Sequence, residues 1–253
     1  MDTIVAKITN DSLTDKKIYE QAGKILREGG LVAFPTETVY GLGADALDEE
    51  ASAKIYAAKG RPSDNPLIVH IADIEALYKL SCEVPDKALK LADKFWPGPL
   101  TMILKKSDIV PDSITGGLGT VAIRMPSHKV AAELIRTSGV YIAAPSANTS
   151  GKPSPTRASH VIKDLSGKID MIIEDDTVDI GVESTIIDLS EEVPTILRPG
   201  YITKEMFEEV IGGVRIDPAI TEGVKSGVVP KAPGMKYRHY APKADLAIVE
   251  GPE

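Results

Sequence analysis

The chain has 253 residues, with 29 Lys and Arg against 37 Asp and Glu, so its net charge is −8 with histidine neutral. Hydrophobic residues make up 43% of the chain and charged residues 26%, which is typical of a globular protein and excludes a chain that is disordered as a whole. The negative net charge argues against an extensive surface that follows nucleic-acid phosphates, but it leaves room for a local basic pocket.

The cysteine content and the N-terminal sequence indicate in which cellular compartment the protein is expected. A single cysteine, Cys82, excludes intramolecular disulfides and cysteine-based metal sites. The first residues lack a basic segment followed by an apolar run, and no stretch approaches about 18 apolar residues, so neither a signal peptide nor a membrane span is predicted. We therefore expect a cytoplasmic protein without membrane contact.

Apolar spacing predicts helices interleaved with short strands. A helix from Thr14 to the glycines at 29–30 precedes a strand at 31–34, and a helix at 48–59 precedes a strand at 67–71. Further helices are expected to begin at Pro85, Ser127, Thr156 and Thr203, and further strands are expected at 100–104, 121–123, 140–144, 171–173, 184–189 and 195–198. This alternation predicts an α/β or mixed α+β fold, with helices on the faces of a sheet.

The hydrophobic periodicity and the composition of the sequence change after about residue 217. Residues 217–244 show little periodicity and contain several Pro and Gly, which indicates a linker. The segment that follows resembles the first strand of a further unit. We therefore expect a catalytic domain at 8–216, a linker at 217–244, and at 245–253 the start of a C-terminal domain that the chain lacks.

Several common mechanisms are not supported. The four histidines, His70, His128, His160 and His239, show no zinc-site spacing, and the chain contains neither a GxSxG nucleophile elbow nor a GxxxxGK[ST] phosphate loop. GLGADA at 41–46 imitates a dinucleotide fingerprint but does not lie in a tight turn from strand to helix.

Polar side chains concentrate instead in loops at the ends of predicted strands. The loop at 59–66 holds Lys59, Arg61, Ser63 and Asn65, which could bind phosphate or carboxylate oxygens. In the competing interpretation, Lys59 only complements the dipole of its helix and Arg61 is solvated.

Similar loops lie at 35–43, 116–124, 145–156 and 181–200. Each could by itself be an ordinary polar turn, and His70 could equally be a core histidine. Five such loops at strand ends in an acidic protein favour a single anion-binding cleft.

The motifs together resemble the YrdC-like threonylcarbamoyl-adenylate synthases, over roughly residues 8–211. They are PTETVYGLG at 35–43, KGRPSDNPL at 59–67, FWPGPLT at 95–101, VAIRMP at 121–126, PSAN at 145–148, ESTIID at 183–188 and LRPG at 197–200. PGMKYRHYAPKADL at 233–246 resembles the linker of the longer family members, which folds back over the active site.

This resemblance implies a fold and an activity. The fold would be a twisted, mixed, open sheet flanked by helices, with a positively charged concave cleft. The enzyme would join L-threonine, bicarbonate or CO2, and ATP into threonylcarbamoyl-AMP and pyrophosphate. The product would serve the downstream tRNA threonylcarbamoyltransferase machinery, and no stable binding of nucleic acid is expected.

The resemblance also implies roles for individual residues. Lys59 and Arg61 would be catalytic. L-threonine would be bound by Thr36, His70, Arg124 and Ser184. The nucleotide would be bound by Lys59, Arg61, Ser63, Asn65, Thr120, Ser146, Asn148, Ser154, Arg198, Tyr237 and Arg238.

Magnesium is expected with ATP, held largely by phosphate oxygens and water, and no metal-binding residue is predicted. Two alternative functions remain open: a carbamoyl-adenylate module of another pathway, and a non-catalytic module that binds double-stranded RNA or tRNA.

Overall fold

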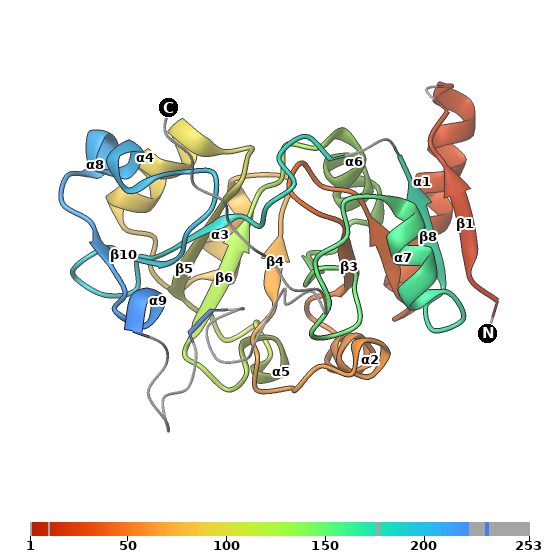
Figure 1. Ribbon diagram of the computed structural model, residues 1–253, viewed down its shortest axis with the longest axis horizontal. Coiled ribbons are helices and arrows are strands. Elements are labelled where there is room, and N and C mark those ends of the chain that lie inside the picture. The colour runs from red at the N-terminus through yellow and green to blue at the C-terminus, as the bar shows by residue number, and fades with distance from the viewer. Residues whose placement is uncertain (1, 10, 176–177, 223–230, 233–253) are drawn as a thin grey trace, which may run out of the picture.

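The computed structural model describes residues 2–9, 11–175, 178–222 and 231–232 (Figure 1). Its strands are β1 (Ile4–Lys7), β2 (Val32–Phe34), β3 (Gly41–Asp45), β4 (Ile68–His70), β5 (Leu100–Lys105), β6 (Thr120–Arg124), β7 (Ile142–Ala143), β8 (Met171–Glu174), β9 (Thr185–Asp188), β10 (Thr195–Arg198) and β11 (Arg215–Ile216). Its helices are α1 (Ser12–Arg27), α2 (Glu49–Lys59), α3 (Glu75–Leu80), α4 (Asp86–Phe95), α5 (Asp112–Thr115), α6 (Lys129–Ser138), α7 (Ala158–Leu165), α8 (Lys204–Ile211) and α9 (Ala219–Glu222).

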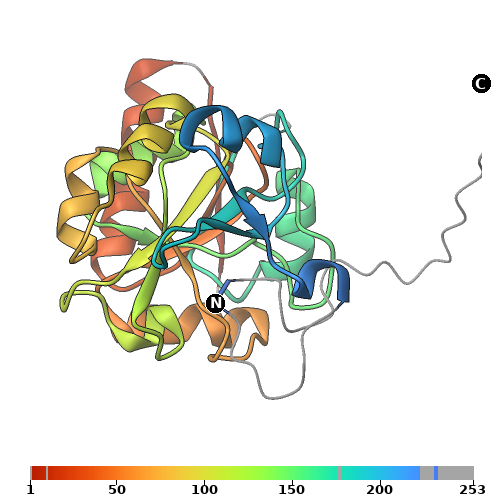
Figure 2. The same ribbon diagram turned by 90° about the vertical axis from the view of Figure 1, so that its left-hand side faces the viewer.

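The described strands form one sheet of eleven strands, in the order β1-β8-β2-β3-β7-β4-β6-β5-β9-β10-β11. The sheet contains parallel pairs, such as β4 with β6, and antiparallel pairs, such as β5 with β6, which confirms the expected mixed sheet. Helices flank both faces of the sheet (Figure 2).

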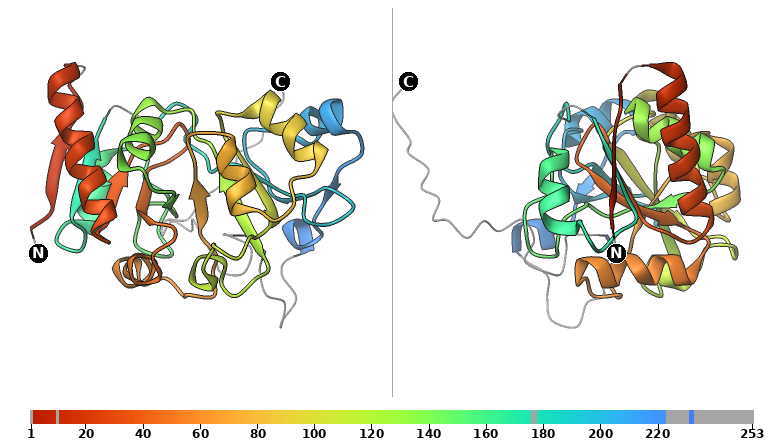
Figure 3. Two further views of the ribbon diagram at one scale, coloured as in Figure 1. Left: turned by 180° about the vertical axis from the view of Figure 1, so that it is seen from behind. Right: turned by 90° about the vertical axis from the view of Figure 1, so that its right-hand side faces the viewer.

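Side chains on the two faces belong to different hydrophobic clusters. Along β2, Val32 and Phe34 pack with α1 and α6, whereas Ala33 between them packs in the cluster on the opposite face. This alternation follows from the two-residue repeat of a strand. Figure 3 shows α1 and α6 side by side on the face opposite α7. The sheet therefore lies between two apolar layers, and its loops remain at the strand ends.

Most predicted elements lie within a few residues of their expected positions, and the structure shows how two of these helices are capped. Asp48 caps α2 by accepting hydrogen bonds from two backbone N–H groups, and Gly60 ends that helix at φ 61°. The hydroxyl of Thr203 caps α8 as expected.

The predicted first residues of α1, α6 and α7 were wrong. Asp11 accepts from the backbone of Thr14, so α1 begins two residues before the expected start. The imidazole of His128, and not Ser127, caps α6. The residue before α7 is Arg157, which makes no side-chain cap. Each predicted start lies within three residues of the observed one. The exact residue could not be predicted, because hydroxyl, carboxylate and imidazole acceptors compete for neighbouring N–H groups.

Six elements were missed: the strands β1, β3 and β11, and the short helices α3, α5 and α9. Strand β1 pairs with β8, so the sheet includes residues that precede the expected domain start at residue 8. Strand β3 is the segment that imitates a dinucleotide fingerprint. A Cβ atom on Gly43 would lie 2.6 Å from Ile142 and 2.8 Å from Phe34, so this glycine permits close packing of strands.

Among the described residues, no helix has both the length and the apolar character that a membrane crossing requires.

Candidate active site

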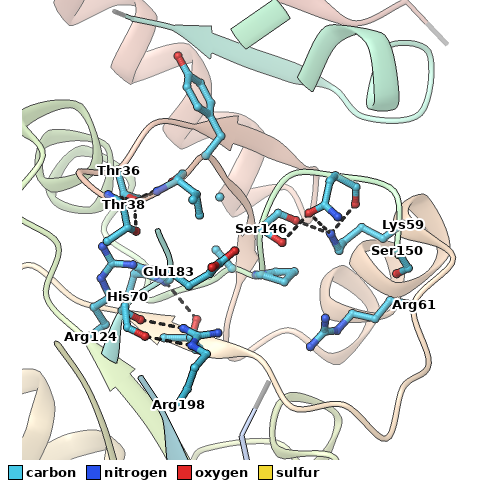
Figure 4. Close-up of a pocket in the computed structure, with 18 of the residues that line it drawn as sticks. Thr36, Thr38, Lys59, Arg61, His70, Arg124, Ser146, Ser150, Glu183 and Arg198 are labelled. Atoms are coloured by element: carbon cyan, nitrogen blue, oxygen red, sulfur yellow. Dashed lines mark hydrogen bonds between the residues drawn. The ribbon is translucent and has the colours of Figure 1, made fainter. Parts of the chain in front are cut away.

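A pocket opens where loops from the middle of the sheet meet (Figure 4). Nine of the predicted site residues line it: Thr36, Lys59, Arg61, His70, Arg124, Ser146, Asn148, Ser184 and Arg198. The loop after β2, the end of α2, and the ends of β4, β6 and β10 supply most of them. Sequence segments as far apart as Thr36 and Arg198 are thus brought to one cavity, as expected for loops at strand ends.

The loop after β2 is held by its own threonine. The hydroxyl of Thr36 donates to the carbonyl oxygen of Val39 at 2.7 Å and accepts from the backbone N–H of Thr38 at 3.2 Å. It also lies 2.9 Å from the hydroxyl of Thr38. Because these bonds are local and buried, Thr36 orders the wall of the pocket.

Arg124 occupies the end of β6, beside the same loop. Its side chain is 5% exposed, and its Nη2 lies 2.7 Å from Oε1 of Glu37, whose side chain is 4% exposed. The Nε atom of Arg124 is buried and has no hydrogen-bond partner among the described residues. A buried donor without a partner is costly, so this nitrogen marks where a ligand acceptor would bind.

His70 is both buried and part of the pocket wall. Its Nδ1 lies 3.1 Å from the carbonyl oxygen of Ile68, and its ring packs edge-to-face on Phe34. Burial, with a smaller contribution from Arg124, lowers the pKa of His70 to about 3. The imidazole is therefore neutral near pH 7, and it lines the pocket without repelling Arg124.

This pKa makes a prediction about stability. The folded state keeps His70 neutral between pH 6.5 and about 3, whereas the unfolded chain protonates it below 6.5. The free energy of unfolding should therefore fall as the pH falls through this window, by about 1.4 kcal/mol per pH unit from this residue. Urea denaturation at pH 7.0, 6.0 and 5.0 should show a shallower loss for His70→Asn than for the unsubstituted chain. Equal losses in the two proteins would contradict the assignment.

Lys59 lies at the end of α2, with its side chain enclosed. Its Nζ donates to the carbonyl oxygens of Ser146 and Asn148, and lies 3.4 Å from the Asn148 side-chain oxygen. Burial, and after it the neighbouring Arg61, lowers the pKa of Lys59 well below its ordinary value. The three oxygens favour the charged form and tie the helix to the loop after β7.

Two arginines complete the basic part of the pocket. Arg198 donates from Nε to the carbonyl oxygen of Ser184 and from Nη2 to its hydroxyl, both at 3.0 Å. The same hydroxyl lies 2.7 Å from that of Thr101. Arg61 donates to the carbonyl oxygen of Pro66 at 3.2 Å. Both guanidinium groups are therefore oriented by backbone carbonyl oxygens.

Four predicted nucleotide-binding residues lie outside the lining of the pocket: Ser63, Asn65, Thr120 and Ser154. Thr120 begins β6, and Arg124 ends it, so about 13 Å of strand separates Thr120 from Arg124. Ser63 is exposed on its loop, whereas Asn65 is buried. The remaining two, Tyr237 and Arg238, lie outside the described residues. These six assignments stay predictions, as do the roles assigned to the nine residues that line the pocket.

The lining also includes residues to which sequence analysis gave no role, among them Thr38, Ser150 and Glu183. Thr38 and Glu183 lie within motifs that were noted for their neighbours. The acidic residues were overlooked because the loops were read as binding an anion. Glu37 was overlooked for the same reason, although it lies next to Thr36.

Residue 232 lies close to this site. Ala232 is fully buried in a cluster that includes the pocket residue Ile68. Lys231 pairs with Asp188 at 3.1 Å and with Glu191 at 3.0 Å. This part of the expected linker therefore packs on the sheet beside the pocket.

Comparison with known protein families decides where the chain belongs. A family model for Sua5, YciO and YrdC proteins, described as "Telomere recombination", matches residues 24–200. The chain is a member of this family. A second model, described as "Threonylcarbamoyl-AMP synthase, C-terminal domain", matches residues 202–253. The expectation that the C-terminal domain is lacking was therefore wrong: the residues read as a linker and an isolated strand themselves match that domain's sequence pattern.

Individual relatives agree with the family models. The threonylcarbamoyl-AMP synthase of Pyrococcus abyssi is 58% identical over 250 residues, which cover 99% of this chain and 72% of the relative. The enzyme of the same name from Bacillus subtilis is 54% identical, over 96% of this chain and 70% of the relative. The crystal structure of P. abyssi Sua5 complexed with L-threonine superposes with a TM-score of 0.92 at 56% identity, covering 100% of this chain and 73% of that one.

Proposed function

We propose that the chain is a threonylcarbamoyl-AMP synthase, which forms threonylcarbamoyl-AMP and pyrophosphate from L-threonine, bicarbonate or CO2, and ATP, for the modification of tRNA. The observation that carries the proposal is that one pocket holds a buried arginine with an unpartnered donor, Arg124, and a separate basic group around Lys59. The first suits the carboxylate of an amino acid and the second suits phosphates. The similarity to the two named synthases supports this assignment.

The reaction needs little covalent chemistry from the protein. The amine of threonine captures CO2 as a carbamate, and a carbamate oxygen attacks the α-phosphorus of ATP while pyrophosphate leaves. Negative charge then increases on the phosphoryl oxygens, so positioning and electrostatic stabilisation supply the catalysis. In this scheme Arg124 holds the threonine carboxylate, whereas Lys59 and Arg61 face the phosphates.

The loop after β7 would contribute polar contacts to the nucleotide. The hydroxyl of Ser146 donates to the side-chain oxygen of Asn148 at 2.5 Å, and Lys59 binds the backbone of both residues. The loop is thus organised before a nucleotide arrives, which reduces the ordering cost of binding.

We propose that Mg2+ enters with ATP, held by phosphate oxygens and water. In the part of the chain that the structure describes, no group of three or more His, Cys, Asp and Glu side chains could hold a metal ion. Bound there, the ion would neutralise phosphate charge. A location in the cytoplasm also remains our proposal, supported by the single cysteine.

Pyrophosphate release tests the function directly. The protein is incubated with ATP, L-threonine and bicarbonate, and pyrophosphate and the mass of any adenylate are followed. We expect release only when threonine and bicarbonate are both present, and a product with the mass of threonylcarbamoyl-AMP. Release without threonine would instead indicate a carbamoyl-adenylate module, and binding of RNA without any release would indicate a nucleic-acid-binding module.

A further inference from the structure

Behind the pocket, Glu37 and Arg124 form a buried ion pair. Oε1 of Glu37 lies 2.7 Å from Nη2 of Arg124, and both side chains are at most 5% exposed. No other ion pair of the described residues has both side chains so well buried. Glu37 is absent from the lining of the pocket, whereas Arg124 and both neighbours of Glu37 are part of it. Glu37 therefore lies behind the pocket wall, in contact with Arg124 and not in the lining itself.

Glu37 also joins three segments of the site. Its Oε2 accepts from the backbone N–H of Ser127 at 3.2 Å, just beyond β6. Its carbonyl oxygen accepts from the N–H of Ile180 at 2.9 Å, on the segment that leads to Ser184. One residue thus connects the loop after β2, the end of β6 and the segment before β9.

The contact with Glu37 orients the guanidinium group of Arg124. A guanidinium group is planar and carries its donors in a fixed fork, so a strong bond at Nη2 restricts the directions in which the other donors point. Its buried Nε remains without a partner among the described residues. We infer that Glu37 is a positioning residue for the amino-acid substrate: it holds the Arg124 guanidinium so that the unpartnered Nε can donate to the substrate carboxylate.

The charges of the surroundings support this role. His70 is neutral, so Glu37 is the group that balances Arg124 in the buried part of the site. With an amide at position 37, the charge of Arg124 would be uncompensated and its orientation would be held by a weaker hydrogen bond. The inference rests on the proposed function, because it assumes that the substrate carries a carboxylate.

The test is Glu37→Gln, which keeps the size of the side chain and removes its charge. We expect the Michaelis constant for threonine to rise roughly tenfold or more. Turnover at saturating threonine and the Michaelis constant for ATP should change less than threefold. Glu37→Asp, which keeps the charge, should recover part of the loss. Equal effects on both substrates, or no effect on threonine, would overturn the inference.

A double-mutant cycle shows whether Glu37 acts through Arg124. Threonine binding is measured by calorimetry without ATP for Glu37→Gln, Arg124→Met and the double variant. Because Glu37 is assigned no contact with the substrate, Glu37→Gln should cause no further loss in the Arg124→Met background. Independent, additive losses would contradict the assignment.

Asp170→Asn is the control for the loss of a carboxylate charge at a partly buried acceptor. Oδ2 of Asp170 accepts from the backbone N–H of Leu31 at 2.7 Å, at the end of β2 away from the pocket. This variant should lose stability without losing affinity for threonine. The unsubstituted chain separates the two proposals: no threonine-dependent pyrophosphate release there would refute the function, whereas normal release with unchanged threonine affinity in Glu37→Gln would refute only the inference.

Discussion

Replacing Arg124 with alanine should raise the Michaelis constant for threonine by roughly 100-fold or more, since two charge-assisted hydrogen bonds together contribute about 3 kcal/mol. The expected loss falls on threonine because the side chain lies beside Thr36 and His70, on the amino-acid part of the pocket. Pyrophosphate release at varied threonine, with ATP saturating, measures it. A Michaelis constant for threonine within threefold of the value for the unsubstituted chain would contradict the role of Arg124.

The same substitution also changes stability, and a second variant separates the two effects. Arg124→Ala leaves Glu37 buried without its partner, which costs about 3 to 5 kcal/mol of folding free energy. Arg124→Met combined with Glu37→Gln removes both charges and keeps most of the volume. The double variant should therefore regain stability in urea denaturation while threonine binding stays weak.

Replacing Lys59 with methionine should lower turnover by roughly a hundredfold to a thousandfold, the range typical for removing one donor that stabilises transition-state charge. The substitution removes a positive charge near the phosphates and also releases the loop at Ser146 and Asn148. Threonine affinity in the absence of ATP should be unchanged, because Arg124 and His70 are untouched. Calorimetry with threonine and pyrophosphate release at saturating substrates measure the two quantities.

Lys54→Met is the matched control for this substitution. Lys54 lies on the same helix, and its Nζ donates to the carbonyl oxygen of Gly29 at 2.6 Å, away from the pocket. The Lys54→Met substitution should leave turnover unaltered. If Lys59→Met turned over as fast as Lys54→Met, the electrostatic role of Lys59 would be refuted.

The sequence predicted much of the fold because the core residues repeat with clear periods. Helix α1 and strand β2 were located by such patterns and by the glycines between them. Strand β3 was missed because its glycines carry no apolar signal, and its packing on Phe34 and Ile142 is a tertiary effect. Strand β1 was missed because it is an edge strand with exposed residues such as Val5.

The site was predicted less completely, for a different reason. Loop composition identified the cations and hydroxyl groups that meet in the pocket, but it could not show how each is oriented. Thr120 and Arg124 share one motif, yet the strand between them separates their positions. Glu37 was not identified because its role depends on a contact with a residue 87 positions away.

The strand order determines when the pocket forms during folding. Strand β8 lies between β1 and β2, and β9 lies beside β5, so neighbours in the sheet are far apart in the sequence. Folding rates fall as contacts become less local, because the entropy of closing long loops is lost before those contacts form. The pocket draws on segments from Thr36 to Arg198, and it is therefore complete only when nearly the whole sheet has assembled. A ligand that binds this late-formed site favours the native state as a whole, so substrate concentration becomes part of what keeps the chain folded.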